Sequence, residues 1–145
     1  MTHPAFITDI LLVEDNEGDI ELTKTAFEIA EVSFRLSVTN DGAEAVEYLF
    51  KRGRFRDAIT PRIILLDINM PRMDGMEFLK TIKQDEQLKI IPVIMLTSSS
   101  AQTDILESYR RHANSYIIKP HGINAGVDMV KKIESFWIGL SRLPG

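Results

Sequence analysis

The amino-acid sequence predicts one α/β domain: a (βα)5, doubly wound sheet of five parallel strands with helices on both faces. The first observation behind this fold class is a set of short aliphatic runs, at residues 10–13, 63–66 and 90–96. Runs without polar alternation are typical of strands that are buried on both faces. The second observation is that segments with helical spacing of apolar residues follow these runs. Strands that alternate with helices over short connections indicate a parallel sheet with right-handed crossovers.

The N-terminal half of the domain supplies the first two strands and their helices. Residues 10–13 predict a strand, and Asn16 with Asp19 three residues later resembles an N-cap pair that begins a helix. Residues 33–39 alternate between apolar and polar side chains, which indicates an edge strand. The turn sequence Asn-Asp-Gly at residues 40–42 then begins the second helix.

The C-terminal half supplies three more strands. Residues 63–66 form the third, and the turn that ends at Gly75 leads into the third helix. Residues 90–96 form the fourth strand, whose proline belongs at the strand start or at an unpaired position. Residues 115–118 form a short fifth strand.

Two further helices complete the alternation. Residues 101–113 predict a helix that turns Ile105 and Tyr109 toward the core. The last helix has an apolar face of Val127, Val130, Ile133 and Trp137.

Length and composition fit one compact domain. The chain has 145 residues, 44% of them hydrophobic and 26% charged, with a formal net charge of −4 and no cysteine. The mild acidity argues against general binding to nucleic acid or to anionic membranes, and the lack of cysteine excludes thiol chemistry. Since no leader or membrane-spanning run is apparent, we expect a cytoplasmic protein. We expect a short N-terminal tail at 1–8, the domain at 9–140 and a C-terminal tail at 141–145.

Polar side chains follow four of the predicted strands at the point where each strand ends. They are Glu14 with Asp15, Asp67, Thr97 and Lys119. In a doubly wound sheet the carboxyl ends of neighbouring strands meet in one crevice, where ligands bind. Gathered carboxylates require a cation, and oxygen ligands without Cys or His favour Mg²⁺. A carboxylate beside Mg²⁺, a lysine and a hydroxyl is suited to accept a phosphoryl group.

Four sequence motifs resemble the receiver domain of bacterial two-component response regulators. They are VEDN at 13–16, LDINMPRMDG at 66–75, LTS at 96–98 and YIIKP at 116–120. The resemblance spans nearly the whole chain and implies a flavodoxin-like sheet of order 2-1-3-4-5. It also implies a signalling protein that catalyses only its own Mg²⁺-dependent phosphorylation and dephosphorylation, and is not otherwise an enzyme.

The resemblance implies a phosphoacceptor and a set of metal ligands. Asp67 would accept the phosphoryl group from the phosphohistidine of a sensor histidine kinase. Glu14, Asp15 and Asp67 would hold Mg²⁺, together with the backbone carbonyl of Asn69. Because Glu14 stands where many members of the family have Asp, its extra methylene suggests that it acts through a bound water.

The resemblance also implies residues that respond to the phosphoryl group. Thr97 would hydrogen-bond a phosphoryl oxygen, Lys119 would pair with it, and Tyr116 would move inward together with Thr97. The bond between Lys119 and Pro120 resembles a cis peptide of the family. The acidic residues Glu17, Asp19 and Asp74, in contrast, are best interpreted as cap, turn or surface residues.

Two alternative functions remain open at this point. One is a receiver-fold binding module that signals without phosphate. The other is a phosphatase of the haloacid-dehalogenase type, which would need an acid where this chain has Asn69. The complete set of polar residues at the strand ends favours the phosphorylated regulator.

The last helix predicts a protein partner. A second apolar stripe, of Met129, Ile133, Phe136 and Leu140, is wider than one core-facing side requires. Either this helix packs slightly deeper into the core than usual, or the stripe forms a homodimer through the last helix and the face that this helix forms with the fourth helix and the fifth strand. The IESFW run at 133–137 and the basic loop at 51–56 resemble single-domain regulators associated with phytochrome-type kinases. Output is expected through protein contacts, without binding to nucleic acid or membrane.

Overall fold

The computed structural model describes residues 7–144 and contains a five-stranded parallel sheet of order β2-β1-β3-β4-β5. The strands are β1 (Thr8–Val13), β2 (Phe34–Thr39), β3 (Ile63–Leu66), β4 (Val93–Thr97) and β5 (Ser115–Ile118). The predicted fold class and strand order are therefore confirmed, with β2 at an edge. Most of the predicted N-terminal tail, residues 1–6, lies outside the described residues, and the domain limits stay a prediction.

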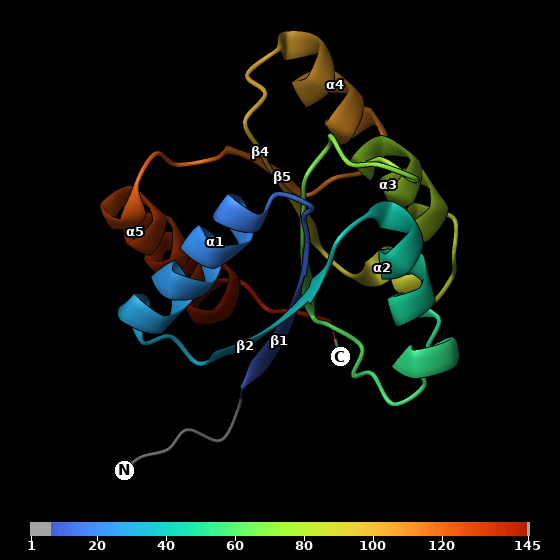
Figure 1. The fold of residues 1–145 in the computed structure, drawn as a ribbon, viewed down its shortest axis with the longest axis horizontal. Coiled ribbons are helices and arrows are strands. Elements are labelled where there is room, and N and C mark those ends of the chain that lie inside the picture. The colour runs from blue at the N-terminus through green and yellow to red at the C-terminus, as the bar shows by residue number, and fades with distance from the viewer. Residues whose placement is uncertain (1–6, 145) are drawn as a thin grey trace.

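Helices cover both faces of the sheet, as the alternating pattern predicts. They are α1 (Glu17–Ala30), α2 (Gly42–Leu49), α3 (Gly75–Lys83), α4 (Gln102–Arg110) and α5 (Ile123–Ile133). In Figure 1, α1 and α5 lie together on one side of the sheet, whereas α2 and α3 lie on the other. Two short 3₁₀ helices, Gly53–Phe55 and Leu88–Ile90, complete the connections. Among the described residues, no helix has the length and apolar character needed to cross a membrane.

The central strand β3 positions the candidate site. All four of its side chains are buried, because odd positions face one core and even positions the other. Val13 of β1 pairs with Leu66 of β3, and Leu66 pairs with Met95 of β4. The backbone N–H of Asp67 donates to the carbonyl of Val13 at 3.1 Å. The residues that follow β1, β3 and β4 therefore emerge at the same edge of the sheet.

Short polar side chains begin three of the helices. Asn16, Asp41 and Asp74 each accept a hydrogen bond from the backbone N–H three residues later, at 2.9, 2.8 and 3.0 Å. These bonds satisfy N–H groups that a helix leaves without partners in its first turn. The predicted cap at Asn16 and the helix start at 40–42 are confirmed, and so is the interpretation of Asp74.

The structure corrects the predicted orientation of α4. The helix is shorter than expected, and Tyr109, expected in the core, is 48% exposed. Ser108 takes the inward position instead, where its hydroxyl donates to the carbonyl of Asp104 at 2.8 Å. A serine whose hydroxyl donates to a carbonyl of its own helix can be buried at little cost in free energy. The prediction from hydrophobicity alone therefore turned the wrong residue of α4 toward the core.

The C-terminal helix divides the predicted apolar stripe between core and surface. After α5, the chain continues as a π-type helix over Glu134–Leu140. Met129 and Ile133 pack in the core with the residues of α1, whereas Phe136 is 51% and Leu140 75% exposed. Only the second half of the stripe is therefore available to a partner.

Candidate functional site

Three carboxylates converge at the carboxyl ends of β1 and β3. Oxygen atoms of Glu14, Asp15 and Asp67 all lie within 4.8 Å of one another. Glu14 and Asp67 are buried, and Asp15 is exposed toward solvent. An all-oxygen cluster with one solvent-facing member fits a hard divalent cation that keeps part of its water shell. The predicted set of metal-binding side chains is thus brought together.

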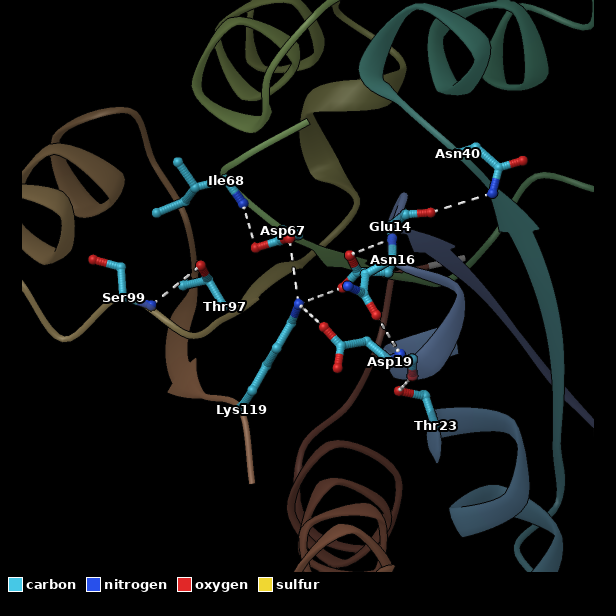
Figure 2. A network of polar contacts seen from close by, with 10 residues as sticks. All are labelled: Glu14, Asn16, Asp19, Thr23, Asn40, Asp67, Ile68, Thr97, Ser99 and Lys119. Atoms are coloured by element: carbon cyan, nitrogen blue, oxygen red, sulfur yellow. Dashed lines mark hydrogen bonds and ion pairs between the residues drawn. The ribbon is translucent and has the colours of Figure 1, made fainter. Parts of the chain in front are cut away.

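Lys119 lies within the same cluster (Figure 2). Its Nζ is 2.6 Å from Oε1 of Glu14 and 3.3 Å from Oδ2 of Asp67. A third carboxylate, Oδ2 of Asp19 in the first turn of α1, lies at 2.7 Å. The lysine, which comes from the end of β5, therefore joins β1, β3 and α1.

The environment shifts the pKa values of both Glu14 and Lys119. Burial raises the pKa of Glu14 to about 7, although the hydrogen bond from Lys119 acts in the opposite direction. Burial also acts to lower the pKa of Lys119, but the hydrogen bonds to Asp19 and Glu14 and the charge of Asp67 outweigh it. The net result is a pKa of Lys119 above its ordinary value. Lys119 is therefore cationic at any physiological pH.

A second group of contacts links Thr97 to β5 and α4. Thr97, the last residue of β4, is fully buried, and its Oγ1 lies 3.5 Å from the backbone N–H of Ser99. The hydroxyl of Tyr116 donates to the carbonyl of Ser99 at 2.9 Å, and the hydroxyl of Ser99 donates to Asp104 of α4 at 2.6 Å. Burial raises the pKa of Tyr116, so its phenol stays protonated and able to donate. Ser99, which the sequence analysis did not single out, is the residue that these contacts share.

Backbone contacts hold the loop between β3 and α3. The backbone N–H of Ile68 donates to Oδ1 of Asp67, and the N–H of Gly75 donates to the carbonyl of Ile68, both at 2.8 Å. The N–H of Gly42 donates to the carbonyl of Met73 at 2.9 Å, which fastens the loop to the start of α2. The side chain of Asn69 is exposed.

An ion pair adds to this attachment of the loop. Nε of Arg72 lies 2.7 Å from Oδ2 of Asp41, the cap of α2. Burial acts to raise the pKa of Asp41, but the hydrogen bonds from Arg72 and from the backbone of Glu44 lower it overall. Asp41 therefore carries its negative charge at neutral pH while it caps the helix and holds Arg72.

Two expectations about this region are wrong. Asp19 was interpreted as a cap or surface residue, but its carboxylate pairs with Lys119. No peptide bond among residues 7–144 is cis, so the bond between Lys119 and Pro120 is trans. The lysine reaches the carboxylates from a trans backbone, because its four-carbon side chain spans the distance.

The fold and the site together define a class of protein. A 2-1-3-4-5 sheet with an aspartate, a carboxylate cluster and a lysine at its carboxyl edge is typical of phosphorylatable signalling domains.

Comparison with known proteins shows the family within that class. The sequence profile of the response regulator receiver domain matches residues 10–131, and the chain belongs to this family. It is 38% identical over 135 residues to the response regulator Rcp1 of Synechocystis sp., covering 93% of this chain and 92% of Rcp1.

Two solved structures support the same conclusion. The phosphorylated cyanobacterial phytochrome response regulator RcpA superposes with a TM-score of 0.90 at 41% identity, covering 97% of this chain and all of RcpA. The Mn²⁺-bound form of Rcp1 gives a TM-score of 0.86 at 38% identity, covering 95% and 99% of the two chains. The protein is therefore a phosphorylatable receiver of two-component signalling, a family of signalling proteins that bind a divalent metal at an acidic pocket.

Proposed function

We propose that Asp67 is the phosphoacceptor and that it takes the phosphoryl group from the phosphohistidine of a sensor histidine kinase. One observation carries this proposal: Asp67 directly follows the central strand, within reach of two further carboxylates and of Lys119. A carboxylate oxygen attacks phosphorus as the N–P bond breaks, and the imidazole nitrogen keeps the electron pair of that bond. The product is an aspartyl phosphate, and the kinase imidazole, which carries a proton on its other ring nitrogen or takes one from water, leaves in its neutral form.

Glu14, Asp15 and Asp67, with the backbone carbonyl of Asn69, are the residues that would hold Mg²⁺. The oxygen-only donor set fits this ion. When bound, Mg²⁺ neutralises charge on the phosphoryl oxygens. The proposal that Glu14 acts through water is consistent with its ion pair with Lys119 at 2.6 Å, which occupies one of its oxygens.

Lys119, Thr97 and Tyr116 are proposed to stabilise and report the phosphoryl group. Lys119 supplies a fixed positive charge beside the accepting oxygen. Thr97 supplies a hydroxyl, and the contacts of Ser99 connect Thr97 with Tyr116 and α4. A small movement of Thr97 toward the phosphoryl group can therefore shift the loop before α4, which is the two-state element of the switch.

Labelling with a small phosphodonor tests the proposal. Acetyl phosphate with Mg²⁺ is expected to phosphorylate the wild type and to leave Asp67→Asn unlabelled, as intact mass and acid-labile phosphate would show. A matched control is Asp74→Asn, because Asp74 is a helix cap of the same charge seven residues away. Labelling of Asp67→Asn, or none of the wild type, contradicts the proposal and favours a binding module that signals without phosphate.

The kinase partner is proposed to be of the phytochrome type. RcpA, named as a phytochrome response regulator, is similar to this chain over nearly its full length. Phosphotransfer from a panel of purified kinases would test this, with phytochrome-type kinases expected to transfer fastest. The cytoplasmic location stays a prediction.

A homodimer through the last helix and the face of α4, β5 and α5 is also proposed. Exposed apolar side chains gather on these elements: Leu106, Tyr109, Ile118, Phe136, Ile138 and Leu140. Burial of apolar side chains of this kind is the main source of affinity in self-association. Sedimentation at about micromolar concentration should show a dimer for the wild type and a monomer for Phe136→Ala/Trp137→Ala. Ile90→Ala, at an exposed apolar residue outside this face, should leave the dimer intact.

A further inference from the structure

Lys119 has one more carboxylate partner than the proposed chemistry uses. Its Nζ lies 2.7 Å from Oδ2 of Asp19 but 3.3 Å from Oδ2 of Asp67. Figure 2 shows the ammonium group between these side chains and Glu14. An ammonium group has three N–H donors, and three carboxylates surround this one. A phosphoryl oxygen that binds Lys119 therefore competes with an existing partner.

The carboxylate of Asp19 is not needed to begin α1. The backbone N–H of Asp19 donates to Asn16, which is the cap, and its carbonyl accepts from the hydroxyl of Thr23 at 2.8 Å. Both contacts use the backbone of Asp19. Its side chain is directed instead toward Lys119, 100 positions away in sequence. Neutralising this carboxylate would therefore leave the helix start in place.

The geometry points to Asp19 as a positioning residue that holds Lys119 back from Asp67 and so slows phosphorylation. This inference rests on the proposed function of Asp67 and Lys119. The contact to Asp19 is the shorter of the two, so the lysine is held closer to α1 than to the accepting carboxylate. Removing the charge frees Lys119 for the phosphoryl oxygens.

The rate of phosphorylation by acetyl phosphate at saturating Mg²⁺ tests this inference on the full chain. Asp19→Asn should accelerate phosphorylation by about fivefold, the low end of coupling between interacting sites. The matched control is Glu17→Gln, which removes the same charge from the same turn of α1. Glu17 is exposed and forms no ion pair within residues 7–144, so Glu17→Gln should change the phosphorylation rate by less than about twofold. Asp19→Glu, which keeps the charge, should return the rate toward that of the wild type.

A second background separates a contact with Lys119 from a general charge effect. When Asp19→Asn is combined with Lys119→Met, phosphorylation should be no faster than in Lys119→Met alone, because the ammonium group that Asp19 holds is gone. If the acceleration persists there, or if Asp19→Asn is slower than the wild type or equal to Glu17→Gln, the inference is wrong. In each of these outcomes the wild type and Asp67→Asn still show whether Asp67 is the acceptor. A wild type that is not labelled would overturn the proposed function itself, and this inference with it.

Discussion

Gly75→Ala is the substitution that most directly connects the packing of the loop after β3 with the site. An added Cβ at position 75 would lie 2.1 Å from the carbonyl oxygen of Asp67 and 2.8 Å from the Cα of Ile68. Normal contacts between such atoms begin about 1 Å farther out. Both opposing atoms belong to the backbone, so no rotamer change can relieve the overlap. The loop that follows Asp67 has to move instead.

The expected loss of stability follows from two opposing effects. Overpacking of this kind costs about 1–3 kcal/mol, or more where backbone must shift. Alanine in a helix regains up to about 1 kcal/mol relative to glycine. We therefore expect a net loss of about 2 kcal/mol in the free energy of unfolding in urea. We also expect slower labelling by acetyl phosphate, because Asp67 and the carbonyl of Asn69 lie on the displaced segment.

The matched control is Gly126→Ala in α5. There the added Cβ would lie 3.4 Å from the Cβ of Ala26, which is close to ordinary contact. This variant should be as stable as the wild type or up to about 1 kcal/mol more stable, with an unchanged labelling rate. If Gly75→Ala matches Gly126→Ala in both measurements, the close approach of α3 to Asp67 does not constrain the site.

Three further predictions concern charge, core and metal. Since the pKa of Asp41 is lowered on folding, its charge adds stability above its ordinary value of 3.8, and that stability is lost as pH falls through the lowered pKa. In urea, the free energy of unfolding of Asp41→Asn should thus be lower than that of the wild type at about pH 7, and the difference should shrink toward zero below about pH 4. A difference that does not depend on pH would exclude the ion pair with Arg72 as its cause. Phe78→Ala, at a fully buried residue of α3, should lower the free energy of unfolding by about 3–5 kcal/mol in the same assay. A decrease below about 1 kcal/mol would contradict the place of Phe78 in the core. Mg²⁺ at about 100 times its Kd should stabilise the wild type by about 2.7 kcal/mol, and equal stabilisation of Asp15→Asn would exclude Asp15 as a ligand.

The fold and the central part of the site could be predicted because their signals are local in sequence. The run at 63–66 is uniformly aliphatic, and Asp67 follows it directly. The same short segment therefore predicts both the strand and the position of the Asp67 carboxylate. The register of parallel strands then carries Glu14 and Thr97 to the same edge. No side-chain detail is needed for that step.

The contacts that escaped prediction depend on packing between distant elements. Asp19 meets Lys119 because the long side chain of Lys119 extends from the end of β5 to the first turn of α1, and the spacing of Asp19 from Asn16 suggested a cap in any case. Tyr109 was placed in the core by its apolar ring, whereas the buried position belongs to Ser108. In both places the periodicity of the sequence located the helix but not the partner of each side chain.

Several contacts hold the backbone around Asp67, the proposed phosphoacceptor. Asp67 continues the strand that has neighbours on both sides, its amide is bonded to Val13, and Gly75 closes against its carbonyl. If Asp67 is phosphorylated as proposed, these contacts leave its backbone little room to move. We therefore expect the adjustment to phosphorylation in the segments that follow β4 and β5, while the β2 side of the sheet stays in place. Domains fused at the β2 side should accordingly leave signalling intact, whereas a crosslink between α4 and β5 should silence it.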